Sequence, residues 1–106
     1  MLRHKEKGPL ISFQTQQGLA QLGHNLRVAR LRRGESETLA AQRIGVSRQT
    51  WRRMEEGDPA VSSGAIFEAL SVYGFTDQIF SLADPDRDLD GKAQDAARRP
   101  KRGRSS

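Results

Sequence analysis

The sequence has no cysteine and few residues that could fill a large core. Without cysteine among the 106 residues, neither a disulfide framework nor a thiolate metal site is possible. Apolar residues make up 35% and aromatic residues 6% of the chain, so we expect a small, helical core. A domain of about 60–70 residues can still be stable if association with another molecule adds burial.

Long hydrophobic runs are also missing. No apolar stretch approaches the roughly 20 residues that a membrane-spanning helix needs. The basic residues near Met1 are not followed by the apolar stretch of a signal peptide. These features predict a soluble, cytoplasmic protein.

Groups for catalysis are equally scarce. His4 and His24 are the only histidines, and they lie 20 residues apart without a group of carboxylates around them, so a metal site is not expected. No serine has an evident base, and no phosphate-binding loop is visible. We therefore expect no catalytic residue, no metal and no cofactor, and the chain is not predicted to be an enzyme.

The charges are unevenly distributed along the chain. The net charge is +2 over residues 1–24, +4 over 25–57, −6 over 58–97 and +5 over 98–106. A basic first half and an acidic second half suggest one face for a polyanion and another that avoids it. A solvated surface of mixed charge is the alternative explanation.

Apolar residues at steps of three and four predict five helices. Serine residues suited to helix N-caps, and Thr76 before the last helix, mark the starts, while glycines mark several ends. The expected helices are 17–33, 37–44, 48–56, 63–73 and 77–82. We divide the chain into a flexible N-terminal arm (1–16), a folded domain (17–83), and an acidic turn with a disordered basic tail (84–106).

The most informative segment is the corner Gly45-Val46-Ser47 between two short helices. Gly45 suits a left-handed backbone conformation, Val46 can fill the space between the helices, and Ser47 can cap the second one. That second helix carries a polar, basic outer face. A short helix of this kind fits a DNA major groove about 12 Å wide.

Together these residues resemble the Xre/Cro-type helix-turn-helix repressors. The resemblance covers residues 19–82 and is carried by Arg30, Ala41, Gly45-Val46-Ser47 and Glu55-Glu56-Gly57. It implies an all-α, five-helix lambda-repressor-like domain that acts as a transcriptional repressor. It also implies a homodimer on a palindromic operator in double-stranded DNA, and hence association with the nucleoid.

The resemblance also assigns roles to individual residues. Arg30 and Glu55 are expected to form a structural ion pair. The DNA contacts that it implies are Ser36, Ser47, Arg48, Gln49, Arg52 and Arg53, with the serines on phosphates and the others on bases. Three residues depart from the family pattern. Glu37 stands where Gln often contacts phosphate, and its carboxylate would repel a phosphate. Ala40 stands where Leu is usual and Trp51 where Leu or Ile is usual, so a small and a large side chain compensate in volume; the alternative is a partly exposed Trp51 that stacks on a ligand.

A finer resemblance, to HipB-like antitoxins, is carried by residues 57–62 and by Ala83-Asp84-Pro85. It implies a toxin–antitoxin operon that the protein autoregulates, and a HipA-like toxin kinase as partner. The charge of −6 over residues 58–97 suggests that the acidic second half and the tail face this partner. Alternatively, the basic tail folds back onto DNA or only aids solubility. The alternatives are a stand-alone Xre-type repressor without a toxin, or a protein-interaction module with little DNA binding.

The end of the expected domain is rich in large apolar side chains. A single short helix cannot bury all of them alone. They either complete the core of the monomer or form the dimer interface that the resemblance implies. These residues are Phe75, Ile79, Phe80 and Leu82.

Overall fold

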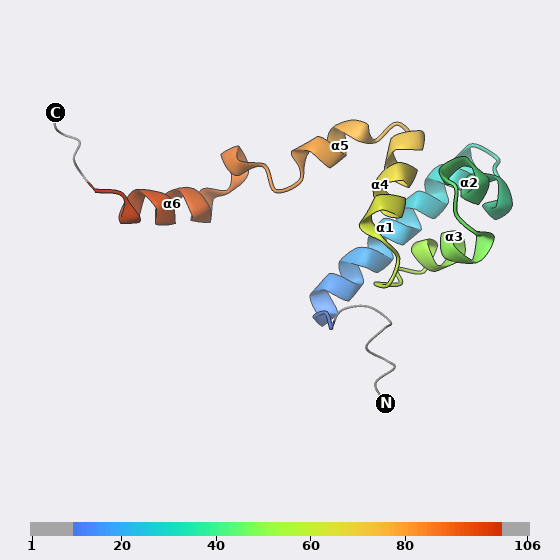
Figure 1. Ribbon diagram of the computed structural model, residues 1–106, viewed down its shortest axis with the longest axis horizontal. Helices are drawn as coiled ribbons and strands as arrows, with labels where there is room; N and C mark the ends of the chain where they lie inside the picture. Colours follow the sequence, from blue (N-terminus) through green and yellow to red (C-terminus); the bar gives the residue numbers. More distant parts are fainter. Residues whose placement is uncertain (1–9, 101–106) are drawn as a thin grey trace. The chain divides into compact units, whose positions relative to one another are not determined.

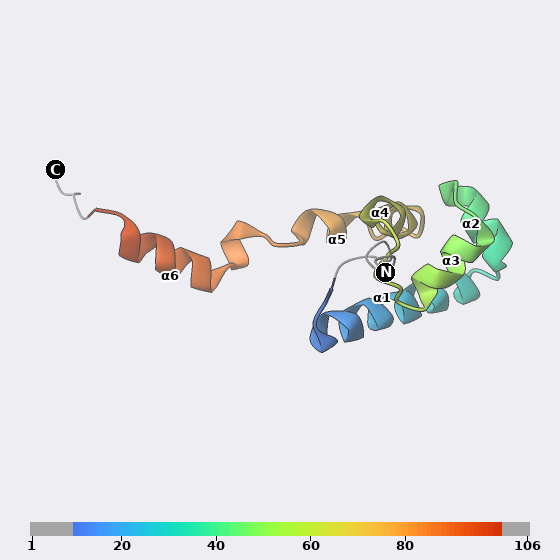
Figure 2. The ribbon, with the colours of Figure 1, turned by 60° about the horizontal axis from the view of Figure 1, so that its bottom comes forward.

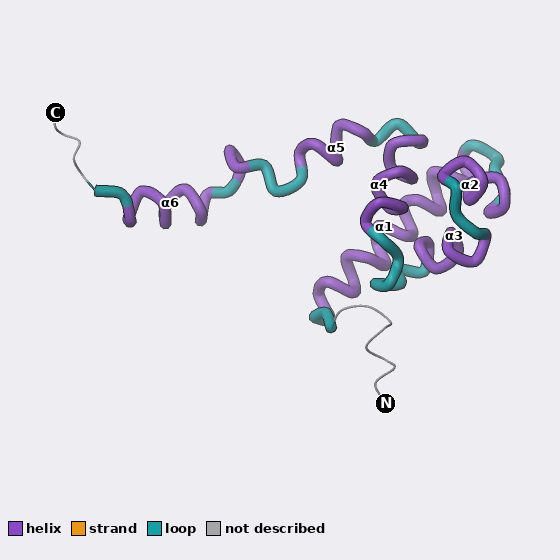
Figure 3. Tube along the Cα trace, in the orientation of Figure 1, coloured by secondary structure: helices purple, strands orange, loops and turns teal. Residues whose placement is uncertain are grey.

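The computed structural model describes residues 10–100, and all regular structure in this range is helical (Figure 3). The chain divides into two compact units, Met1–Thr76 and Asp77–Ser106. Most of the predicted arm (1–9) and the end of the basic tail (101–106) lie outside the described residues. None of the helices in the described range is long and apolar enough to cross a membrane.

Four helices form the first unit: α1 (Phe13–Arg32), α2 (Glu37–Ile44), α3 (Arg48–Glu55) and α4 (Ser63–Val72). Each begins after a serine whose hydroxyl oxygen accepts a backbone N–H of the first turn, at 3.0 or 3.1 Å. Such a cap stabilises a helix by about 1 kcal/mol. The four caps are Ser12, Ser36, Ser47 and Ser62.

Helix α1 begins at Phe13, whereas the sequence predicted a flexible arm as far as residue 16. Two hydrogen-bonding contacts stabilise the added turn, one at each end. Ser12 caps it, and the side-chain amide of Gln16 donates a hydrogen bond of 2.8 Å to the backbone oxygen of Gly57. Polar side chains dominate this turn, so it has no apolar periodicity from which a helix could be predicted.

The core lies where α3 packs against both α1 and α2, while α4 packs on α2 (Figures 1 and 2). Trp51 and Leu26 are the largest fully buried side chains. Helices α1 and α3 approach so closely at Gly23 that a Cβ atom there would collide with backbone oxygens of α3. Trp51 and the small Ala40 are both buried, as expected if a large and a small side chain compensate in volume.

The second unit contains α5 (Thr76–Ser81), which begins at the unit boundary, a 3-10 turn (Pro85–Arg87) and α6 (Leu89–Arg98). Helix α6 lies where the sequence predicted a disordered tail, so the described residues contain one α-helix more than predicted. Its order is local. The Asp88 carboxylate accepts the Gly91 N–H at 2.8 Å, and Asp95 pairs with Arg99 at 2.9 Å, but no residue of α6 is buried.

Candidate nucleic-acid interface

The corner between α2 and α3 is built by three consecutive residues. Gly45 has a φ of 73°, and its N–H donates to the carbonyl oxygen of Gln42 at 3.2 Å. The N–H of half-buried Val46 donates to Ala41 at 3.0 Å, and Ser47 then caps α3. This geometry ends α2 and starts α3 within three residues, as the sequence predicted.

Helix α3 has one buried and one exposed face. Trp51 and Met54 point into the core, whereas the predicted base-reading residues are exposed. Three of them line one surface hollow of about 260 Å³: Arg48, Gln49 and Arg52. The fourth, Arg53, lies apart from that hollow with its Nε atom 4.0 Å from a carboxylate oxygen of Asp58.

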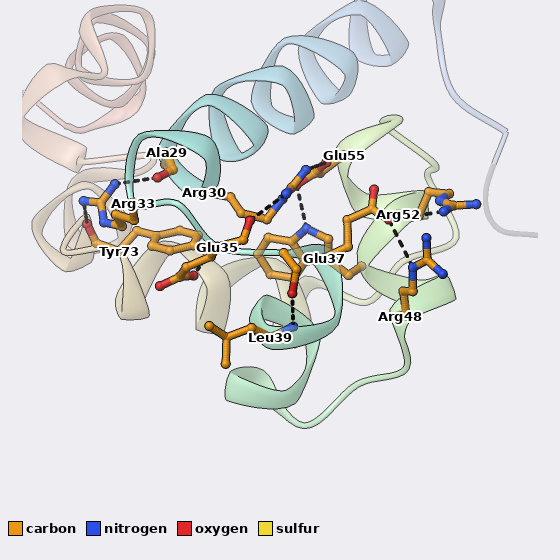
Figure 4. Close-up of polar contacts among 12 residues, drawn as sticks. Ala29, Arg30, Arg33, Glu35, Glu37, Leu39, Arg48, Arg52, Glu55 and Tyr73 are labelled. Carbon is orange, nitrogen blue, oxygen red and sulfur yellow. Dashed lines mark hydrogen bonds and ion pairs between the residues drawn. The ribbon is translucent and has the colours of Figure 1, made fainter.

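Glu37, in the first turn of α2, contacts two of these arginines (Figure 4). Its Oε1 atom accepts hydrogen bonds from Nε of Arg48 at 3.3 Å and from Nη2 of Arg52 at 3.2 Å. Desolvation on its own would raise the pKa of Glu37, but the hydrogen bonds from Arg52 and Arg48 outweigh it and hold that pKa below its ordinary value. The carboxylate is therefore ionised at neutral pH.

A buried ion pair joins α1 to α3. Arg30 donates from Nε to Oε2 of Glu55 at 2.7 Å and from Nη2 to Oε1 at 3.1 Å, so the two groups meet in a bidentate arrangement (Figure 4). The hydrogen bond to Glu55 raises the pKa of Arg30 above its ordinary value, although burial opposes this. The two side chains are only 7% and 6% exposed, which makes the pair structural.

Trp51 extends this ion pair into the core. Its indole Nε1 donates to Oε2 of Glu55 at 2.6 Å, so the buried carboxylate accepts hydrogen bonds from two side chains. The remaining Nη1 of Arg30 donates to the backbone oxygen of Glu35 at 2.8 Å. The alternative of a partly exposed Trp51 that stacks on a ligand is wrong, because its exposed fraction is 0%.

A second polar cluster, around Tyr73, was not predicted. The Tyr73 hydroxyl donates to Oε1 of Glu35 at 2.9 Å, and the same carboxylate pairs with Arg43. The guanidinium of Arg33 lies 4.9 Å from the centre of the Tyr73 ring. Burial, together with the hydrogen bond to Glu35, raises the pKa of Tyr73 to about 12. The cluster ties the end of α4 to the loop between α1 and α2.

The other predicted site residues have different surroundings. Ser36 and Ser47 use their hydroxyl oxygens as N-cap acceptors, and both lie at exposed helix starts. Of the predicted dimer residues, Phe75 and Ile79 are half-buried, while Phe80 and Leu82 are 83% and 58% exposed. Within residues 10–100 no group of three or more His, Cys, Asp or Glu side chains is arranged to hold a metal ion.

A family model described as a helix-turn-helix domain matches residues 21–79, which is more than half of the chain and includes the whole of α2, α3 and α4. No curated protein and no solved structure matches the chain.

Proposed function

Because the chain belongs to the helix-turn-helix domain family, we propose that it binds double-stranded DNA in a sequence-specific manner and regulates transcription. One observation carries the proposal. Arg48, Gln49 and Arg52 lie together on the exposed face of α3, while its opposite face is fixed in the core by Trp51. A rigid helix with a polar outer face is the element that enters the major groove in this class of protein.

In the proposed complex, the arginines donate to O6 and N7 of guanine, and Gln49 pairs with adenine. Each good bidentate contact discriminates against a wrong base by about 1–3 kcal/mol. The exposed starts of α2 and α3, with Ser36 and Ser47, contact phosphates and set the register of the helix on the duplex. The Arg30–Glu55 pair supports this function indirectly, because it fixes α3 against α1.

The test is selection of bound duplexes from a randomised DNA pool by the full chain. We expect enrichment of a short motif that contains guanine. The double variant Arg48→Ala/Arg52→Ala, shown by circular dichroism to be folded, should enrich no motif. If the unaltered protein enriches none either, the proposal fails, and the interaction module with little DNA binding becomes the better account.

We further propose that the DNA-binding form is a homodimer acting as a repressor on a palindromic operator. Support comes from the second unit, where α5 and the residue after it expose Phe80 and Leu82 beside half-buried Ile79. Exposed side chains of this size favour burial against a second copy. In sedimentation experiments, the unaltered chain should be a dimer and Phe80→Ser a monomer. A monomeric unaltered chain at concentrations that saturate the operator would contradict this proposal.

The finest form of the proposal is an antitoxin that represses its own operon and binds a HipA-like kinase. It is supported by the resemblance of residues 57–62 and 83–85 to HipB-like antitoxins, and by the aspartates exposed around the 3-10 turn and α6, which suit a basic partner surface. Co-purification with the product of the neighbouring gene tests it. A complex that forms equally well after truncation at Ala83 would exclude the acidic segment as the docking element. If nothing binds, the stand-alone repressor remains.

A further inference from the structure

Glu37 lies at the start of α2 and contacts the exposed face of α3, although it belongs to neither the core nor the recognition helix. We propose that Glu37 is a specificity-determining residue, which positions Arg48 and Arg52 for base edges and weakens their binding to DNA of arbitrary sequence. The inference rests on the proposed function, since it concerns how α3 discriminates among duplexes.

The first argument is geometric. Arg48 donates to Glu37 through Nε, which leaves the edge formed by its two terminal Nη atoms without a partner among residues 10–100. Two parallel donors of this kind are what O6 and N7 of a guanine require. Arg52 uses only Nη2, so Nη1 and Nε also remain available. Glu37 therefore restrains both side chains while leaving donors for base contacts.

The second argument compares the exposure of the two arginine side chains with that of Glu37. The arginine side chains are 59% and 51% exposed, whereas that of Glu37 is only 20% exposed. An unrestrained exposed arginine samples many rotamers and binds any phosphate that it reaches. The more fixed carboxylate holds each guanidinium by a charge-assisted hydrogen bond that must break before the arginine can turn to a phosphate. Contacts to base edges need not break it.

The third argument is electrostatic. Among the charged groups of α2 and α3, Glu37 is the carboxylate that contacts the cluster of Arg48 and Arg52, and its charge offsets part of theirs. Affinity for DNA of arbitrary sequence depends on how many phosphates the cations neutralise. Glu37 therefore reduces the sequence-independent part of binding more than the sequence-dependent part, and the ratio of the two affinities rises.

Two variants separate positioning from charge. Glu37→Gln keeps the length of the side chain and removes the charge, so the affinity for random duplex should rise about two- to fivefold. The salt dependence on random duplex, log K against log salt, should steepen by about 0.9, as for one additional phosphate contact. Glu37→Asp keeps the charge but shortens the reach, so the affinity for the selected motif should fall about fivefold, while the affinity for random duplex should rise less than in Glu37→Gln.

The matched control is Glu68→Gln, an exposed position on α4 with the same change of charge. It should leave the ratio of the two affinities and the salt dependence as in the unaltered protein. A measurement without DNA accompanies these: the NMR resonance of the Arg48 Nε–H group should shift in both Glu37 variants, and that of Arg53 should not.

The outcomes distinguish this inference from the proposed function. If the unaltered protein prefers a motif but both Glu37 variants give the same ratio as Glu68→Gln, the role of Glu37 is overturned and DNA recognition by α3 stands. An unshifted Arg48 resonance in both variants would overturn it as well. If the unaltered protein has no sequence preference, the proposed function fails, and this inference fails with it.

Discussion

The two units of the chain are both helical, but they are stabilised differently. In the first unit, the helices enclose Trp51 and a bidentate buried ion pair. In the second unit, no described residue is buried, and α6 is held by its own cap and by one ion pair between neighbouring turns. A single helix of this length is marginal in water. The first unit is thus a cooperative domain, whereas α6 depends on local contacts.

The largest effect on stability should come from a substitution in the core of the first unit. Trp51→Ala removes the largest fully buried side chain and should lower the free energy of unfolding by about 3–5 kcal/mol. Urea denaturation followed by circular dichroism measures it. Trp51→Phe, which keeps most of the volume, should lose less. A Trp51→Ala protein within about 1 kcal/mol of the parent would contradict the central place of Trp51 in the core.

Breaking the buried ion pair should be similarly costly. Glu55→Gln keeps an acceptor for Trp51 but leaves the Arg30 charge unpaired, and should destabilise the first unit by about 3–5 kcal/mol. Its exposed neighbour provides the control, since Glu56→Gln should change stability by no more than about 0.5 kcal/mol. Adding Arg30→Met to Glu55→Gln should restore part of the loss. Equal effects of Glu55→Gln and Glu56→Gln would mean that the pair contributes nothing.

Raising the pH should weaken the first unit through Tyr73. Its pKa rises from an ordinary value of 10.0 to about 12 in the folded protein. The unfolded chain therefore ionises first, and stability present below pH 10 should be lost as the pH rises towards 12, by about 2–3 kcal/mol in total. Tyr73→Phe should remove this part of the pH dependence. Because Tyr73 is the only tyrosine, phenolate absorbance reports its pKa directly.

The smallest effect is expected in the second unit. Asp88→Ala removes the N-cap of α6 and should cost that helix about 1 kcal/mol, seen as reduced helical NMR shifts over 89–98. The stability of the first unit should not change. Asp86→Ala is the control: it also removes one negative charge, but the Asp86 carboxylate caps no helix in the described part of the chain. This variant should leave the helicity of α6 unchanged. A lower stability of the first unit in Asp88→Ala would show that α6 is not locally stabilised.

The sequence predicted those parts of the fold that depend on local signals. The caps Ser36, Ser47 and Ser62 and the turn at Gly45 are encoded within a few neighbouring residues, and the structure has them. The first turn of α1 and the helix α6 were not predicted because each contains a single large apolar side chain, Phe13 and Leu89. Their caps, Ser12 and Asp88, were the available signals.

The candidate site was predictable only in part, for the same reason. The exposed residues of α3 followed from the periodicity of a short helix. The Tyr73–Glu35 hydrogen bond joins residues far apart in the chain, so no local sequence pattern predicts it. The sequence predicts that the Glu37 carboxylate repels phosphate, but its contacts with Arg48 and Arg52 depend on how α2 and α3 pack.

The central claim is that the exposed face of α3 reads DNA sequence, and one measurement tests it most directly. The ratio of the dissociation constants for random and selected duplexes is determined at one salt concentration for the unaltered chain, Arg52→Ala and Arg87→Ala. The last variant loses the same charge from the second unit. We predict that Arg52→Ala lowers this ratio about tenfold, as expected for a lost base contact of about 1–3 kcal/mol, while Arg87→Ala leaves it unchanged. Equal weakening of both duplexes by Arg52→Ala would contradict the claim.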